Sequence, residues 1–454
     1  MKIRALSLAL MAASLSGQVS AAGYYVDEQS ALRLGNAFSG GAASANDAST
    51  AYYNPAGLVR IKRELATNIS AISVNSSSDS SATTVGGAPI DGSDPDAKNV
   101  DYLPTIYFAS PIGKESAMGF FVNAPYATGA EVGEDTNARY QATESNITGI
   151  DLGVSFATRL NKNLSFGASV IAQYMEAYTA VAVNTPAACA GAAMEAGLTN
   201  MVDIGTFCAT NFNIDVSKLG TADQDGSFEM EGDSIDYGFD VGVLYEISPS
   251  SRFGMNYKSA IKHTLEGDAT ATFKAETQAF IPTTKADGEA DLTTPEVLNM
   301  SYFHQLGRLS LQGDLSWSRW SRFDQLEVKS DNATIQSLAA EPQQYNWTES
   351  YRIAFGGDYK LNNVLTLRSG FAFDQTPIND NDTKVDFAFD DYKALSFGLS
   401  YAMGAGATLD LAMQHTLTQE RSIDQNELDT AGAHLTGDVT TEVNSFALGI
   451  RMAL

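Results

Sequence analysis

The sequence predicts an all-β protein, an antiparallel transmembrane β-barrel of about 14 strands whose lumen holds an N-terminal helical hatch. Three observations support this prediction. The chain opens with an export signal, most of it alternates apolar and polar residues, and tight turns alternate with long connections. We therefore assign residues 1–21 to a signal peptide, 22–63 to the hatch (plug) and 64–454 to the barrel.

The export signal comes first. Lys2 and Arg4 precede an apolar run over residues 5–15, and small residues at 19–21 suit cleavage after Ala21. No other stretch approaches the roughly 18–20 apolar residues that a membrane-spanning helix needs. An exported chain of this kind is either soluble or a barrel in the outer membrane of a Gram-negative bacterium.

Alternation separates these two possibilities. In residues 309–318 the odd positions are apolar apart from one glycine, and the even positions are polar. Successive side chains of a strand point to opposite faces, so such segments have one apolar and one polar face. Charged residues fall on the polar register: Asp151, Arg159, Asp240, Asp314, Arg352, Asp358, Arg368 and Asp410. A membrane barrel directs these charges into its lumen and its apolar face to lipid and lipopolysaccharide.

Connection lengths support the barrel further. Tight turns are expected near residues 161–163, 307–308, 362–363 and 404–406. Long connections are expected at 75–101, 184–226, 266–289, 330–344, 375–392 and 418–440. Short turns at the periplasmic end and long loops at the extracellular end are typical of bacterial barrels.

Residues 22–63 lack the alternation and instead suggest short helical turns broken by Gly and Pro. A barrel of this width encloses a water-filled channel unless something fills it. We therefore expect this segment to be a plug. A periplasmic tail is the alternative, and it would leave a general diffusion porin.

Composition excludes several other functions. The formal net charge of −26 argues against a nucleic-acid partner. The four histidines are scattered, and neither a G-x-S-x-G nor an H-E-x-x-H element occurs, so we expect no enzyme, cofactor or metal site. The acidic run at residues 379–382 could hold calcium, but it lacks EF-hand spacing and a solvated loop is the simpler interpretation.

The only two cysteines, Cys189 and Cys208, lie in the same expected loop. Because disulfides form in exported proteins, we predict that these two residues form one that staples the loop.

Several motifs resemble the FadL family of outer-membrane transporters for long-chain fatty acids and other hydrophobic compounds. Residues 22–28 and 35–40 resemble its hatch, as does the motif Asn54, Pro55, Ala56, Gly57. The likeness continues in residues 320–323, 351–356 and 368–374 and spans essentially the whole mature chain. It implies a monomeric 14-stranded barrel with a hatch, in agreement with the strand count above. It also implies passive uptake through an extracellular groove, an inner pocket and a lateral opening in the wall.

The resemblance and the apolar content of the loops together suggest ligand-binding residues. Tyr24 and Tyr25 would reach the inner pocket, although they could simply anchor the plug. The groove would be lined by apolar loop residues, which could equally pack against one another: Met194, Leu198, Met201, Phe207, Phe212, Phe273, Phe280 and Ile281.

For the lateral opening we expect a damaged strand. Pro125 lies inside the expected third strand, between Asn123 and Gly129, and proline cannot donate to a strand ladder. The matching strand of the family is kinked inward, which implies an opening here. An ordinary bulge is the alternative.

One feature departs from the pattern expected for a fatty acid carrier. Basic residues are expected to line the pocket from strands five and nine, but our alignment finds Glu176 and Glu327 there. Arg33, Arg319, Arg322 and Lys329 are nearby in sequence and could substitute. Otherwise the ligand could be neutral, such as an alkane or a monoaromatic hydrocarbon, because a buried carboxylate without a partner is costly.

Overall fold

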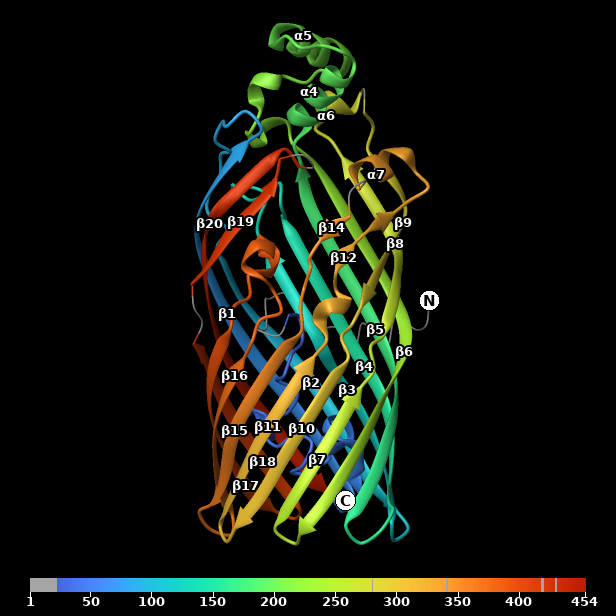
Figure 1. The fold of residues 1–454 in the computed structure, drawn as a ribbon, viewed down its shortest axis with the longest axis vertical. Coiled ribbons are helices and arrows are strands. Elements are labelled where there is room, and N and C mark those ends of the chain that lie inside the picture. Colours follow the sequence, from blue (N-terminus) through green and yellow to red (C-terminus); the bar gives the residue numbers. More distant parts are fainter. Residues whose placement is uncertain (1–22, 280, 340–341, 418–419, 429–430) are drawn as a thin grey trace.

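The computed structural model describes residues 23–279, 281–339, 342–417, 420–428 and 431–454. These residues form one closed antiparallel barrel around an N-terminal segment (Figure 1). The predicted signal peptide lies outside the described residues. Among the helices in these ranges, none is long and apolar enough to cross a membrane.

The wall closes where the first strand pairs with the last. Four wall strands are each interrupted once, so the 18 segments of the sheet form a 14-stranded barrel, which confirms the predicted fold. The uninterrupted strands are β1 (Glu64–Thr84), β2 (Ala97–Ile112), β3 (Ser116–Glu131), β4 (Glu144–Arg159), β5 (Leu164–Val183), β6 (Gly226–Ser248), β15 (Ser350–Lys360), β16 (Leu365–Asp374), β17 (Tyr392–Gly404) and β20 (Ala433–Ala453). The interrupted strands are β7 (Ser251–Lys258) with β8 (Lys262–Thr272), β9 (Thr284–Thr293) with β10 (Val297–Leu306), β11 (Leu309–Ser318) with β13 (Val328–Lys329), and β18 (Ala407–Leu417) with β19 (Glu420–Glu427). A separate two-stranded sheet joins β12 (Gln325–Leu326) and β14 (Gln343–Gln344).

The two ends of the barrel differ. Tight turns and the C-terminus lie at one end, here called the lower end, and the longer connections with helices lie at the upper end (Figure 1). The α-helices of these upper connections are α4 (Thr185–Glu195), α5 (Met201–Phe212), α6 (Ala275–Gln278) and α7 (Ala333–Leu338). The upper connections also contain short 3-10 helices: η2 (Val216–Lys218), η3 (Ala222–Gln224), η4 (Trp320–Arg322), η5 (Asp380–Asp382) and η6 (Val385–Phe387).

The predicted faces of the strands are confirmed. Of the eight charged residues expected in the lumen, seven are buried and Arg159 is half-buried. The outward face carries apolar side chains such as Phe156, Val170 and Phe355, each more than half exposed. Such a face suits a lipid environment.

Several strands are longer than the alternation indicated. β1 continues to Thr84 and β20 begins at Ala433, inside regions that the sequence predicted to be loops. Only about 9–11 residues are needed to cross a bilayer, so the upper parts of strands of 21 residues stand beyond it. Water lies outside these upper parts, which removes the need for an apolar outer register.

The hatch occupies the lower half of the lumen (Figure 1). It contains α2 (Ala31–Leu34), α3 (Thr50–Tyr53) and η1 (Pro55–Arg60), and β1 begins at Glu64, directly after it. Most of its described residues are buried. The predicted plug is therefore inside the barrel.

Candidate functional site

Wall cations hold the hatch by its backbone. Arg252, Lys258 and Arg352 donate hydrogen bonds of 2.7–2.9 Å to hatch carbonyl oxygens. The acceptors are Ala37, Ala43, Ser44 and Tyr52. Bonds that involve a charged donor are stronger than neutral ones, so these contacts fix the hatch in the lower lumen.

The Asn-Pro-Ala-Gly motif of the hatch contacts the wall directly. The Asn54 side chain donates to the carbonyl oxygens of Ala42 (2.6 Å) and Val243 (3.1 Å) and accepts from the Ala56 amide (3.1 Å). A side chain at Gly242 would overlap the Asn54 side-chain oxygen. The glycine of the wall therefore permits the close approach that this asparagine needs.

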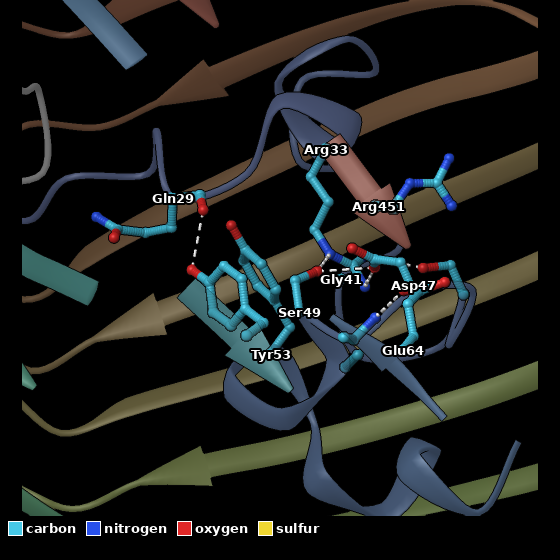
Figure 2. A network of polar contacts seen from close by, with 12 residues as sticks. Gln29, Arg33, Gly41, Asp47, Ser49, Tyr53, Glu64 and Arg451 are labelled. Atoms are coloured by element: carbon cyan, nitrogen blue, oxygen red, sulfur yellow. Dashed lines mark hydrogen bonds and ion pairs between the residues drawn. The ribbon is translucent and has the colours of Figure 1, made fainter. Parts of the chain in front are cut away.

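Arg33 forms the polar centre of the hatch (Figure 2). It is fully buried, donates to Ser49 (3.1 Å) and Ser44 (2.8 Å) and lies 3.5 Å from Asp47. Its guanidinium group also stacks over the Tyr53 ring at 4.4 Å. Arg33 is therefore engaged inside the hatch and does not serve as the basic partner of a ligand.

A small polar cavity lies between the hatch and the wall strands β10, β11, β15 and β16. Arg352 lies in its lining, with oxygens of Asp27 at 2.9 Å and Asp374 at 3.7 Å, and Asp314 lines it as well. Three carboxyl groups surround one guanidinium group. Such a cavity suits water and ions rather than an apolar molecule.

Glu28 of the hatch is buried beside this acidic group. Its carboxyl accepts a hydrogen bond of 2.9 Å from Ser445 on β20. Burial, and then the charge of Asp27, raise the pKa of Glu28 to about 7. Protonation of Glu28 therefore favours the docked hatch.

The wall is discontinuous at β3. Pairing of β2 with β3 runs from Ile112 and Ser116 up to Ile106 and Val122 and stops there. The β3–β4 ladder shifts register between Asn123 and Tyr126. Residues 123–130 are all buried, whereas the lower part of β3 alternates. The strand therefore bends into the lumen at the predicted position, around Pro125, and leaves β2.

The hatch supplies the partner that β3 loses. Val26 donates its amide to the Pro125 carbonyl oxygen (2.8 Å), and Ala127 donates to Tyr24 (3.0 Å). The Gln29 side chain both donates to and accepts from the Ala124 backbone, at 2.7 and 3.3 Å. Backbone groups in a bend need such partners, because an unpaired buried amide is costly. The described structure gives the buried Asn123 side chain no hydrogen-bond partner.

An aromatic cluster lies above the hatch and beside this bend. Tyr24 packs on Trp320 at 4.7 Å and on Phe323 at 5.5 Å between ring centroids. Trp347 packs on Trp320 at 5.2 Å. The cluster also contains Tyr126, Tyr345, Phe387 and Phe389, with Tyr25 against it. Tyr24 and Tyr126 connect the cluster to the bend in β3.

A small apolar pocket lies against the cluster. Six residues belong to both: Ile147, Leu265, Leu292, Phe323, Tyr345 and Phe387. Every described residue that lines this pocket is uncharged. The pocket therefore suits an apolar ligand.

Neither glutamate that we aligned to the pocket lines it. Glu176 lies on the outward register of β5, and its neighbour Ala177 faces the pocket. Glu327 pairs with Lys329 at 3.4 Å, and its neighbour Leu326 lines the pocket. The other basic candidates, Arg319 and Arg322, both pair with Glu296. We expected the two glutamates to repel an acidic ligand in the pocket. The structure shows that neither lines it and that the lining carries no charge.

The family described as outer membrane protein transport protein (OMPP1/FadL/TodX) matches residues 12–454. The chain belongs to this family. It is 25% identical to the long-chain fatty acid transport protein of Escherichia coli O6:H1, with 93% of this chain and 92% of that protein covered. In fold it resembles a FadL homologue of Pseudomonas aeruginosa (TM-score 0.83, 22% identity, 95% and 100% covered). It also resembles the toluene transporter TodX of Pseudomonas putida (TM-score 0.65, 16% identity, 97% and 99% covered).

Membership in this family establishes the general role. The protein is an outer-membrane transporter of hydrophobic compounds in Gram-negative bacteria. The family consists of transporters rather than enzymes. The predicted localisation is thereby confirmed.

The structure places five of the eight predicted groove residues in two separate clusters. Leu198, Phe207 and Phe212 pack around the disulfide between Cys189 and Cys208, which joins α4 to α5. Phe273 and Ile281 pack with Phe228, Ile335 and Leu338 above β6 and β8. Met194 and Met201 are exposed, and Phe280 lies outside the described residues.

The sequence did not identify several residues of the cluster. Trp347, Tyr345, Phe387 and Phe389 lie in the connections that precede β15 and β17. In the second connection the acidic run at residues 379–382 is largely exposed, as expected for a solvated loop, whereas residues 383–389, which follow it, are buried. Asp386 is buried among them, and this burial raises its pKa to about 6. Aromatic residues inside otherwise polar loops were the available signal.

Proposed function

We propose that the protein takes up long-chain fatty acids or similar hydrophobic molecules passively, and that they leave sideways through the wall. The observation that carries this proposal is the end of β2–β3 pairing at Val122, where β3 bends into the lumen beside the aromatic cluster. At this bend the hatch takes the place of the neighbouring strand. Among the described residues, no other stretch of the wall pairs with the hatch in this way.

The proposed route has three stages. A ligand first meets the exposed Met194 and Met201 above the barrel, enters the apolar pocket, and then reaches Tyr24 and Tyr25. It leaves between β2 and β3 at residues 123–129. Each stage keeps the ligand against apolar surface, which avoids returning it to water.

A sideways exit also explains the closed hatch. An apolar solute that emerged below would enter water and lose the favourable free energy of burial. A general diffusion porin, the rival function, needs an open channel, whereas the hatch fills the lower lumen and is held by three cations. The protein would act as a monomer and would deliver its ligand to the surrounding lipid.

Two ligand classes fit the route. The relative in Escherichia coli is named for long-chain fatty acids, and the structural relative TodX is named for toluene. The uncharged lining of the pocket supports the second class, neutral hydrocarbons, as the alternative substrate. It also admits an acid whose carboxyl group enters without its charge.

Cross-linking the wall tests the exit. Pro104→Cys with Ala124→Cys faces the gap, two residues beyond the last β2–β3 pair, Ile106 with Val122, and a short bismaleimide would bridge it. Phe108→Cys with Phe120→Cys is the matched control, because these residues are opposite each other in intact ladder. The native cysteines are already bonded and do not react.

We expect the bridged gap to reduce uptake of radiolabelled oleate and of tetradecane by at least about tenfold, the loss expected when a required step is blocked. The bridged control pair should leave uptake unchanged. Undiminished uptake through the bridged gap would exclude the lateral exit.

A further inference from the structure

Three hydrogen-bond donors lie in the aromatic cluster without an acceptor. The Tyr24 hydroxyl group and the indole N–H groups of Trp320 and Trp347 are buried, and no described protein group accepts from them. Their side chains are between 0% and 2% exposed. Buried donors are almost always paired in folded proteins, because leaving one unpaired is costly.

The three donors are neighbours. Ring centroids are 4.7 Å apart for Tyr24 and Trp320, 5.2 Å for the two tryptophans, and 5.9 Å for Tyr24 and Trp347. The rings that carry the donors thus form one contiguous group, and a polar group at the end of a ligand could reach the donors there. An indole N–H can only donate, so that group must be an acceptor.

The donors lie one ring behind the apolar pocket. Phe323 lines the pocket and packs on Tyr24 (5.5 Å) and on Trp347 (4.8 Å). Rotation of this one side chain would connect the pocket to the donors. The body of a ligand in the pocket would then direct its end toward them.

The surrounding charge disfavours an anion. Tyr345, at the same edge of the cluster, has Lys384 at 5.5 Å from its ring, but Lys384 pairs with Glu427 at 3.2 Å. The buried Asp386 is close as well and interacts electrostatically with Tyr345. These groups leave no excess of positive charge for a carboxylate, and burying one would be costly.

We propose that Tyr24, Trp320 and Trp347 form a recognition site for a neutral oxygen acceptor at the end of an apolar ligand, such as the carbonyl of an ester or of an uncharged carboxylic acid. This inference rests on the proposed function and specifies its substrate class. A ligand without an acceptor leaves the donors unpaired, and sites of this type discriminate strongly against analogues that lack the polar group.

The test compares methyl dodecanoate with tetradecane, two chains of similar length of which only the ester has acceptors. Binding to the full-length protein in detergent is measured by calorimetry for wild type, Trp320→Phe/Trp347→Phe and Tyr24→Phe. Tyr24→Phe keeps the ring and removes only the hydroxyl group, and each Trp→Phe change keeps a smaller aromatic ring and removes the indole N–H. Trp317→Phe is the control, because it removes an indole N–H on the outward register of β11, outside both the aromatic cluster and the pocket.

We expect wild type to prefer the ester, and the preference to fall by about tenfold in the double variant and less in Tyr24→Phe, as loss of neutral hydrogen bonds predicts. Trp317→Phe should keep the wild-type preference. Because micelles take up each ligand equally in all variants, the change in preference reports the site alone. An unchanged preference in the donor variants would overturn the inference.

A second measurement uses the unaltered protein. The chain has three tryptophans, so the indole N–H groups give three resolvable signals in an ¹⁵N-labelled sample. The ester should shift the signals of Trp320 and Trp347 downfield, and tetradecane should not. Equal binding of both ligands without these shifts would refute the acceptor site alone, whereas failure of both to bind would refute the proposed function as well.

Discussion

The lower and upper halves of the lumen differ in the residues that line them. In the lower half, Arg252, Lys258 and Arg352 hold the hatch by its carbonyl groups, and a cavity lined by three carboxyl groups remains. In the upper half, an uncharged pocket lies against an aromatic cluster. Polar contacts hold the hatch across the lumen below, and apolar surface suited to a hydrophobic ligand lies above.

The border between these halves falls between two adjacent residues. Tyr24 packs into the aromatic cluster, whereas Tyr25 bonds to the Tyr52 hydroxyl group of the hatch at 2.9 Å and lines the polar cavity. Both pair with the bent part of β3. The first residues of the hatch therefore connect the polar cavity, the aromatic cluster and the bend in β3.

The largest effect is expected from removing a cation of the lower half. Lys258 lies 3.1 Å from the fully buried Asp240 and donates to the Tyr52 carbonyl oxygen. Lys258→Met leaves that carboxylate buried without its partner, so the free energy of unfolding should fall by about 3–5 kcal/mol. Urea denaturation measures this change, and conductance in planar bilayers should rise as the hatch loosens.

The matched control removes both charges. In Lys258→Met/Asp240→Asn no unpaired carboxylate remains, so most of the lost stability should return. Equal destabilisation in the single and double variants would show that this ion pair does not stabilise the lower half.

A smaller effect is expected from pH. Glu28 has a pKa of about 7 in the docked hatch against an ordinary value of 4.5. Its stabilisation of the hatch is therefore complete below about pH 4.5 and is lost as pH rises through about 7, a difference on the order of 3 kcal/mol by pH 8. Wild-type conductance should be higher at pH 8 than at pH 5.

Glu28→Gln should reduce this pH dependence, because the amide stays neutral throughout, while the carboxyl group of Glu64, which accepts from the Ala48 amide of the hatch, remains. Glu420→Gln, at an exposed position on β19, should retain it. A conductance rise in Glu28→Gln as large as in wild type would assign the pH dependence to another group.

The sequence predicted the barrel because the bilayer imposes a strict pattern on its strands. Residues 309–318 alternate for this reason, and their lumen-facing Asp314 is buried as expected. Where strands extend beyond the lipid, as β1 does up to Thr84, that constraint ends and the alternation stops being informative. The sequence therefore misplaced the strand boundaries there, although it predicted the number of strands correctly.

The candidate site was only partly predictable. Pro125 identified the bend in β3, because proline removes a donor that the ladder needs. The cluster of Trp320, Trp347 and Phe387 was not predicted, since its members come from connections far apart in sequence and meet only in the closed barrel. Glu176 shows most clearly why alignment by sequence failed. A shift of one residue along a strand moves a side chain from the inner face of the wall to the outer face.

The smallest effect is expected from a substitution in the pocket of the upper half. Leu265 is buried and belongs to both the pocket lining and the aromatic cluster. Leu265→Lys brings a cation into apolar surroundings, and uptake of tetradecane should fall about tenfold, the loss expected for about 1.4 kcal/mol of apolar contact. Leu265→Met keeps the apolar volume and should transport normally. Conductance should not change in either variant, because the hatch contacts lie in the other half. A current as large as that of Lys258→Met would show that pocket and hatch are not independent.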